Sequence, residues 1–195
     1  MNIVQKYSAV ALMAFASSPV LAHWALQQEQ SSLHFVTVKN DTIAETNSFN
    51  RFAANINDDG QINVQVDLSS VDTLIDLRNQ RLRDILFNTK KYPKATLAAQ
   101  LDKDYIDDLA QSTPENLDLS IQLTLHGESQ TLPAKLTVTK LDAHTLLVAT
   151  RSPILLNAQQ FSLTAGLTKL QELAGLNSIS PIVPITGNWT FKLEH

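Results

Sequence analysis

The chain has 195 residues, with 15 basic and 19 acidic side chains, 44% hydrophobic residues and no cysteine. A net charge of −4, without a basic stripe of interleaved aromatic residues, argues against a nucleic-acid partner. The lack of cysteine excludes disulfides, thiolate metal sites and a lipid-modified cysteine anchor. The length and composition are sufficient for one domain with a hydrophobic core.

Residues 1–22 have the pattern of a cleavable signal peptide. Lys6 gives a weakly positive start, Ser8 to Ala16 is a short apolar run, and Ala22 offers a small residue for cleavage. The apolar run is too short to span a bilayer, which takes about 20 apolar residues. We therefore expect export to a bacterial periplasm and a single mature domain of residues 23–195.

The first part of this mature chain is predicted to form strands. Residues 32–39 alternate between two faces, and a less regular strand is expected over residues 44–56. The sequence Asn57-Asp58-Asp59-Gly60 is typical of a hairpin turn in which the glycine adopts a positive φ. Residues 62–68 then show the clearest apolar and polar alternation in the chain.

The next segment changes to helical spacing. Between Leu74 and Leu86 apolar residues recur every three to four positions, which predicts a short helix. Asp72 and Thr73 offer side-chain oxygens for its N-cap. Tyr92-Pro93 ends the helical pattern, and residues 95–101 alternate again as a returning strand.

The second half is predicted to be a meander followed by a helix and a closing strand. Meander strands are expected over residues 117–125, 130–140 and 146–150, with short connections that favour antiparallel pairing. Leucines from Leu163 to Leu173 then share one helical face, and Gly175 is the expected C-cap. Residues 183–193 form the predicted closing strand.

These elements predict an all-β, mainly antiparallel fold. About eight strands and two helices suit an eight-stranded lipocalin-like barrel with one or two short covering helices. A β-sandwich is the alternative. An eight-stranded barrel has an interior just wide enough for packed side chains or for one small ligand.

Several motifs resemble the YceI-like family of exported lipid-binding proteins, over nearly the whole mature chain. The motifs are S-x-x-x-F-V-x-V-K at residues 31–39, F-x-x-F at Phe49 and Phe52, V-D-L-S-S-V-D-T at 66–73, R-x-x-R-L-R-x-x-x-F at 78–87, Y-P-K-A-T at 92–96 and L-T-L-H-G at 123–127. Each motif alone is weak, whereas their order and spacing together are specific.

The resemblance implies a lipocalin-like barrel with a helix over one mouth and a long apolar molecule in its lumen, such as a polyisoprenoid or an isoprenoid-quinone tail. It also implies a carrier and not a catalyst. Two departures leave the identity of the ligand open. Lys39 stands where many members carry histidine, and Arg151-Ser152-Pro153 begins a leucine-rich segment that replaces the family's usual R-x-D-F-G stretch.

The apolar residues predicted to bind the ligand come from the inward faces of the strands and from the first helix. They are Leu33, Phe35, Phe49, Phe52, Val64, Val66, Leu82, Leu97, Leu119, Ile121 and Leu123. The same residues also fit an ordinary close-packed core, because periodicity does not separate a packed core from a lined cavity. An interaction module whose barrel is filled by its own side chains is therefore the alternative function.

Basic residues near the first helix are predicted to contact a polar headgroup at the barrel mouth. Lys39, Arg78 and Arg81 are the candidates, since guanidinium groups suit phosphate or carbonyl oxygens. The alternative is a solvated helix face with the pairs Arg78–Asp76 and Arg81–Asp84. Exposed pairs of that kind contribute at most about 1 kcal/mol.

Motifs for catalysis are missing from the sequence. It contains no nucleophile elbow, H-E-x-x-H, phosphate loop or dinucleotide fingerprint, so we expect neither an enzyme nor a cofactor. Cleavage after Ala22 would make His23 a chelating N-terminus, but His34, His126, His144 and His195 lack ligand spacing, and no metal site is predicted. A homodimer and transient contact with a membrane, without embedding, both stay open.

Overall fold

The structure, a computed structural model, describes residues 23–194. The predicted signal peptide and its cleavage point after Ala22 involve residues outside this range. Within the described range, no helix is both long and apolar enough to cross a membrane.

The strands are β1 (His23–Leu26), β2 (Ser32–Lys39), β3 (Ile43–Phe49), β4 (Phe52–Asn57), β5 (Gln61–Asp67), β6 (Val71–Asp72), β7 (Lys94–Gln100), β8 (Glu115–Leu125), β9 (Glu128–Asp142), β10 (Thr145–Thr150), β11 (Ile154–Asn157) and β12 (Ile182–Glu194). The α-helices are α1 (Asp76–Arg81), α2 (Tyr105–Asp108) and α3 (Thr164–Ala174). Short 3₁₀ turns are η1 (Gln28–Gln30), η2 (Leu68–Ser70) and η4 (Ala158–Phe161), and a π-helical turn, η3 (Leu82–Leu86), follows α1.

Pairing between the strands closes the sheet into a barrel. Four of the barrel strands are interrupted, and each consists of two short strands: β1 and β2, β3 and β4, β5 and β6, and β10 and β11. The two short strands count as one barrel strand because both are hydrogen-bonded to the same neighbouring barrel strand. With β7, β8, β9 and β12 they make eight, each beside its neighbour in sequence. Pairing of β1 with β12 closes the ring, so the barrel prediction is confirmed and the sandwich alternative is wrong.

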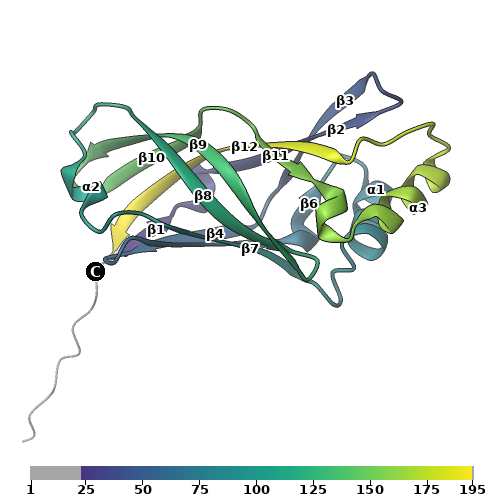
Figure 1. The fold of residues 1–195 in the computed structure, drawn as a ribbon, viewed down its shortest axis with the longest axis horizontal. Coiled ribbons are helices and arrows are strands. Elements are labelled where there is room, and N and C mark those ends of the chain that lie inside the picture. Colours follow the sequence, from purple (N-terminus) through teal and green to yellow (C-terminus); the bar gives the residue numbers. More distant parts are fainter. Residues whose placement is uncertain (1–22, 195) are drawn as a thin grey trace, which may run out of the picture.

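The helices lie at the two ends of the barrel. Figure 1 shows α1 and α3 together at one end, beside β6 and near the β2–β3 hairpin, and α2 at the other end near the C-terminus. The predicted C-cap is confirmed, since Gly175 has a φ of 61° and its N–H bonds back into α3. Gly60 adopts the predicted positive φ, at 76°.

The predicted N-cap of the first helix is wrong. The residue before α1 is Ile75, and no side chain caps the helix. Leu74 adopts a left-handed conformation that turns the chain, so the Asp72 carboxylate accepts a hydrogen bond from the Leu74 N–H at 2.8 Å instead. Asn79, inside the helix, accepts hydrogen bonds from the N–H and hydroxyl of Thr73 at 2.8 and 2.6 Å.

The structure differs from the sequence prediction at two strands. The strand expected over residues 44–56 is interrupted at Asn50 and Arg51, where the chain passes from pairing with β2 to pairing with β1. Strand β1 was not predicted, because four residues are too few for an alternation to be recognised. Its role in closing the barrel depends on partners far away in the sequence.

Candidate functional site

The barrel encloses an elongated cavity of about 570 Å³. Its lining extends from Lys39 and Arg78, at the end that carries α1, to Tyr105 and Ile106 in α2 at the opposite end. The lining is overwhelmingly apolar. Ligand-binding pockets typically measure about 300 to 1,000 Å³, so this lumen has the size and character of a site for an apolar molecule.

All the apolar residues predicted to bind a ligand line this cavity. They are Leu33 and Phe35 in β2, Phe49 in β3, Phe52 in β4, Val64 and Val66 in β5, Leu82 in η3, Leu97 in β7, and Leu119, Ile121 and Leu123 in β8. Alternation along each strand brings them together, because every second side chain points inward. Their role in binding stays a prediction.

The lumen is open and is not filled by its own side chains. Val64 and Val66 point inward from β5, yet both are only partly buried, as are Leu97 and Leu119 on the neighbouring strands. In a close-packed core such residues would be as buried as Leu68, which is 1% exposed. Their remaining exposed surface therefore faces the cavity.

Part of the lining was missed at the sequence level. Leu136 and Val138 of β9 and Val148 of β10 have the inward alternation that could have identified them. Leu167 and Leu170 of α3 also reach the cavity. Their shared helical face was recognisable, whereas the packing of α3 over this end of the barrel depends on tertiary structure alone.

A cluster of charges forms one side of the mouth beside α1. Glu45 in β3 accepts hydrogen bonds from Lys39 Nζ, at 2.7 Å, and from Arg78 Nη1. Arg78 Nη2 also donates to the Thr73 carbonyl at 2.6 Å. All three predicted headgroup residues, Lys39, Arg78 and Arg81, line the cavity.

The alternative pairings proposed for these arginines are wrong. Arg78 pairs with Glu45 of β3 and not with Asp76. Arg81 Nη1 donates to the Leu173 carbonyl at 3.5 Å and forms no ion pair with Asp84. Arg78 therefore interacts with the mouth and Arg81 with α3, and neither forms an ion pair along the surface of its own helix.

Arg78 keeps one donor without a partner. Its Nε is buried and has no hydrogen-bond acceptor within the described part of the chain. Buried donors are almost always satisfied, so an orphaned guanidinium N–H beside a cavity is well placed for an oxygen of a ligand. Asn47, 5% exposed, and Thr37 add further polar groups to this part of the lining.

The Glu45 carboxylate makes the mouth sensitive to acid. The hydrogen bond from Lys39, helped by the charge of Arg78 and opposed by burial, holds the pKa of Glu45 below its ordinary value of 4.5. A lowered folded-state pKa contributes stability that is complete above the unfolded-state pKa and is lost as the pH falls through the folded-state pKa.

Replacing Glu45 should therefore flatten the acid dependence of stability. Between about pH 5 and about pH 3 we expect the Glu45→Gln variant to lose less unfolding free energy than the unmodified protein, in urea titrations at each pH. Glu29→Gln is the control, at an exposed position that forms no ion pair with any other residue of 23–194. Parallel pH profiles for the unmodified protein and Glu45→Gln would contradict the prediction.

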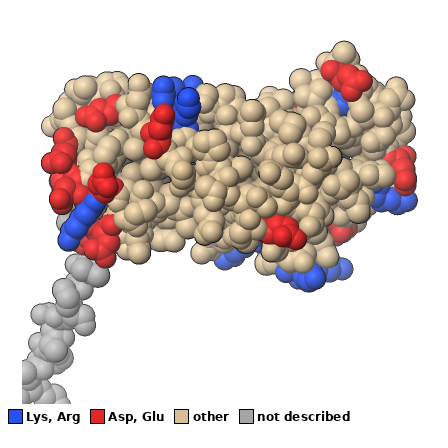
Figure 2. All heavy atoms as spheres, viewed as in Figure 1, with Lys and Arg blue, Asp and Glu red and all other residues tan. Residues whose placement is uncertain are grey.

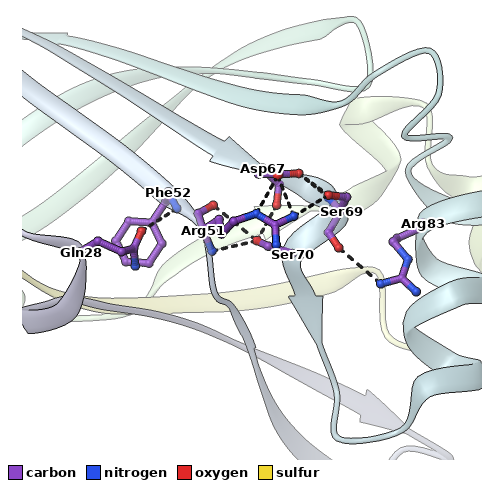
Figure 3. A network of polar contacts seen from close by, with 7 residues as sticks. All are labelled: Gln28, Arg51, Phe52, Asp67, Ser69, Ser70 and Arg83. Carbon is purple, nitrogen blue, oxygen red and sulfur yellow. Dashed lines mark hydrogen bonds and ion pairs between the residues drawn. The ribbon is translucent and has the colours of Figure 1, made fainter.

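The V-D-L-S-S segment anchors the mouth to the barrel wall. Figure 3 shows the Asp67 carboxylate at the centre of a polar network, where it accepts from Arg51 Nε and Nη2 at 3.0 and 2.9 Å and from the Ser69 N–H and hydroxyl at 2.8 and 2.6 Å. Arg83, on η3, donates to the Ser69 carbonyl at 3.4 Å. This motif fixes the bend after β5 and ties the helical segment to it.

No group of three or more His, Cys, Asp or Glu side chains within residues 23–194 is arranged to hold a metal ion. His23 lies near the end of β12, with its Nε2 at 3.9 Å from Glu194 Oε2.

Comparison with known proteins identifies relatives of this barrel. The family described as YceI-like domain matches residues 24–191. A polyisoprenoid binding domain from Saccharophagus degradans, implicated in plant cell wall breakdown, is 36% identical, with a TM-score of 0.85 over 89% of this chain and 99% of that one. BcnA of Burkholderia cenocepacia shares the fold, with 17% identity and a TM-score of 0.66 over 85% of this chain and 98% of its own. No curated protein sequence matches the chain significantly.

Proposed function

This chain belongs to the YceI-like family, and from that premise we propose that its lumen binds the isoprenoid chain of an amphiphilic lipid, such as a polyprenyl lipid or an isoprenoid quinone. The observation that carries the proposal is the open, apolar cavity of about 570 Å³. The Saccharophagus degradans domain, described as binding a polyisoprenoid, supports this ligand class.

Binding would draw on the hydrophobic effect and needs no chemical step. Each Å² of apolar surface that leaves water contributes about 25 cal/mol, reduced by the cost of ordering a flexible chain. The preformed lumen lowers that cost on the protein side, since the walls are held by the closed barrel. We therefore propose a carrier or store and not an enzyme. Export to the periplasm, expected from residues 1–22, would place it between two membranes.

The polar end of the ligand is proposed to lie at Arg78. Arg78 lines the cavity and its buried Nε has no partner within the described residues, so an oxygen of a headgroup would complete its hydrogen bonding. Lys39 and Arg81 lie in the same part of the lining, and their positive charges favour a carbonyl, hydroxyl or phosphate oxygen.

Arg78→Lys is expected to weaken discrimination between headgroups. Lysine keeps the positive charge but lacks Nε, so the preference for a prenyl lipid with a polar head over the bare hydrocarbon should fall about tenfold. Competition with a fluorescent prenyl probe measures this ratio. Arg83→Lys, at a residue of the same helical segment that does not line the cavity, is the matched control and should keep the preference. An unchanged ratio in Arg78→Lys would refute the headgroup assignment.

Native mass spectrometry tests the function itself. The protein is purified from its own host, its mass is measured under native conditions, and co-purifying lipids are extracted with organic solvent and identified. A stoichiometric isoprenoid lipid is the expected result. A protein that carries none and takes up no added prenyl lipid would overturn the proposal.

A further inference from the structure

A group of large apolar side chains is exposed beside the mouth. Leu74 is 89% exposed, and Ile75, Leu77 and Leu173 are exposed as well. We name these four residues the rim patch. Arg81, one turn after Leu77 on α1, donates to the Leu173 carbonyl at the end of α3 and so links the two helices that carry the patch. Single exposed leucines are ordinary on protein surfaces, whereas neighbouring ones indicate a binding surface.

The most exposed member of the rim patch is held in a strained conformation. Leu74 has a φ of 60°, a left-handed backbone that is costly for a residue with a branched, bulky side chain. The hydrogen bond from its N–H to the Asp72 carboxylate and those from Thr73 to Asn79 maintain this turn. The polar network thus presents Leu74 to the outside instead of folding it into the core.

We propose that the rim patch docks on the surface of a lipid bilayer, with the mouth of the barrel facing the membrane. Leu74, Ile75 and Leu77 enter the boundary between headgroups and acyl chains, and Leu173 enters beside them. Arg81 lies at the level of the lipid phosphates. Shallow insertion of an apolar face flanked by charged residues is sufficient for reversible attachment.

The position of the rim patch favours a bilayer over other occupants. Arg78, Arg81 and Leu82 of the same helical segment line the cavity, so the patch lies on a segment that borders the lumen. If the proposed function holds, an apolar chain exchanged here avoids passage through water. Four side chains are too few for a stable protein interface, which needs about 800 Å² and some 20 to 30 residues on each partner.

The distribution of charge favours the same orientation. The opposite end of the barrel, around α2, carries Asp102, Asp104, Asp107 and Asp108, and Figure 2 shows acidic groups gathered along that end. Phosphate headgroups repel such a surface. The helical segment with the rim patch carries both acidic and basic residues, among them Asp76, Arg81 and Arg83, a mixture that a headgroup layer accommodates.

Vesicle flotation tests the proposal with the chain that begins at His23, which contains the whole described barrel. The vesicles consist of phosphatidylethanolamine and phosphatidylglycerol without any isoprenoid, so the lumen ligand plays no part. Replacing both Leu74 and Leu77 with serine (Leu74→Ser, Leu77→Ser) should reduce vesicle binding at least about tenfold. Leu155→Ser is the matched control, since Leu155 is 61% exposed on β11, and it should bind like the unmodified protein.

A second readout reports the contact directly. The chain has no cysteine, so an environment-sensitive dye on Leu74→Cys or Leu155→Cys labels one site only. The emission should shift to the blue on vesicles for Leu74→Cys and stay unchanged for Leu155→Cys.

Equal binding of the rim variant and the unmodified protein, or no vesicle binding by either, overturns the proposal. So does a change from dimer to monomer in the rim variant on sedimentation, which would make the patch an interface between copies.

This outcome is separate from that of the proposed function. A protein that floats with isoprenoid-free vesicles but carries no isoprenoid in native mass spectrometry would keep the docking surface and lose the lipid-carrier proposal. A protein that carries the lipid but does not float with the vesicles would keep the lipid-carrier proposal and lose the docking surface. Circular dichroism of each variant checks that the fold is intact.

Discussion

Val66→Asp is expected to lower the affinity for a prenyl chain at least about 100-fold, the largest effect on binding that we predict. Val66 points into the lumen from β5 and lines the cavity. A carboxylate there stays hydrated while the lumen is open to water, but an apolar chain would have to displace that water and leave the charge unpaired. Desolvating an unpaired charge costs several kcal/mol, which exceeds the 2.7 kcal/mol or so that corresponds to 100-fold.

The neighbouring residue supplies the control. Gln65 lies on the same strand and points to the outside, where it accepts a hydrogen bond from Lys94 Nζ at 2.8 Å. Gln65→Asp adds the same charge one position away and should leave binding unchanged. Displacement of a fluorescent prenyl probe measures affinity, and urea unfolding confirms that both variants are folded. Similar affinities for the two variants would show that the ligand does not occupy the lumen near β5.

Phe161→Ala is expected to cost roughly 3 to 5 kcal/mol of unfolding free energy, the largest effect on stability. Phe161 lies in η4 under α3, is 0% exposed and does not line the cavity. Removing its ring leaves a sealed hole that the surrounding leucines fill only partly. Because the residue packs α3 against the barrel and does not face the lumen, the folded protein should still bind its ligand with the original affinity.

Phe49→Ala is the contrasting variant. Phe49 packs against Phe35 and Phe87, with ring centroids 5.1 and 6.0 Å away, but it also faces the cavity. Removing its ring enlarges a space that is already open, so the loss of stability should be smaller than for Phe161→Ala and the loss of ligand affinity larger. Chemical denaturation and probe displacement on both variants check this. Equal destabilisation by the two changes would indicate that the lumen is packed like a core.

The charged mouth illustrates what sequence reasoning misses. Lys39, Arg78 and Arg81 were identified as candidates from their residue type, and the structure places all three at the lining. Their partners were predicted wrongly, because local spacing favoured Asp76 and Asp84, whereas Arg78 meets Glu45 from a strand 33 residues away. A pairing of that kind depends on the closure of the barrel, which no local pattern contains.

The sequence by itself determined the class of fold and the inward faces of the strands. Alternation along β5, β7 and β8 is a local property with a period of two, and it identified the residues that line the lumen. The sequence also determined the cap at Gly175 and the turn at Gly60, since both depend on the backbone freedom of glycine.

Only the tertiary structure decided whether those inward faces meet or leave a space. The same alternation fits a filled barrel and an open one, because the width of the lumen depends on how eight strands close through β1 and β12. The pairing of Arg78 with Glu45 and the placement of α3 over the mouth also depend on tertiary structure. Each depends on contacts between segments distant in sequence, whose geometry is set by the assembled barrel and not by local spacing.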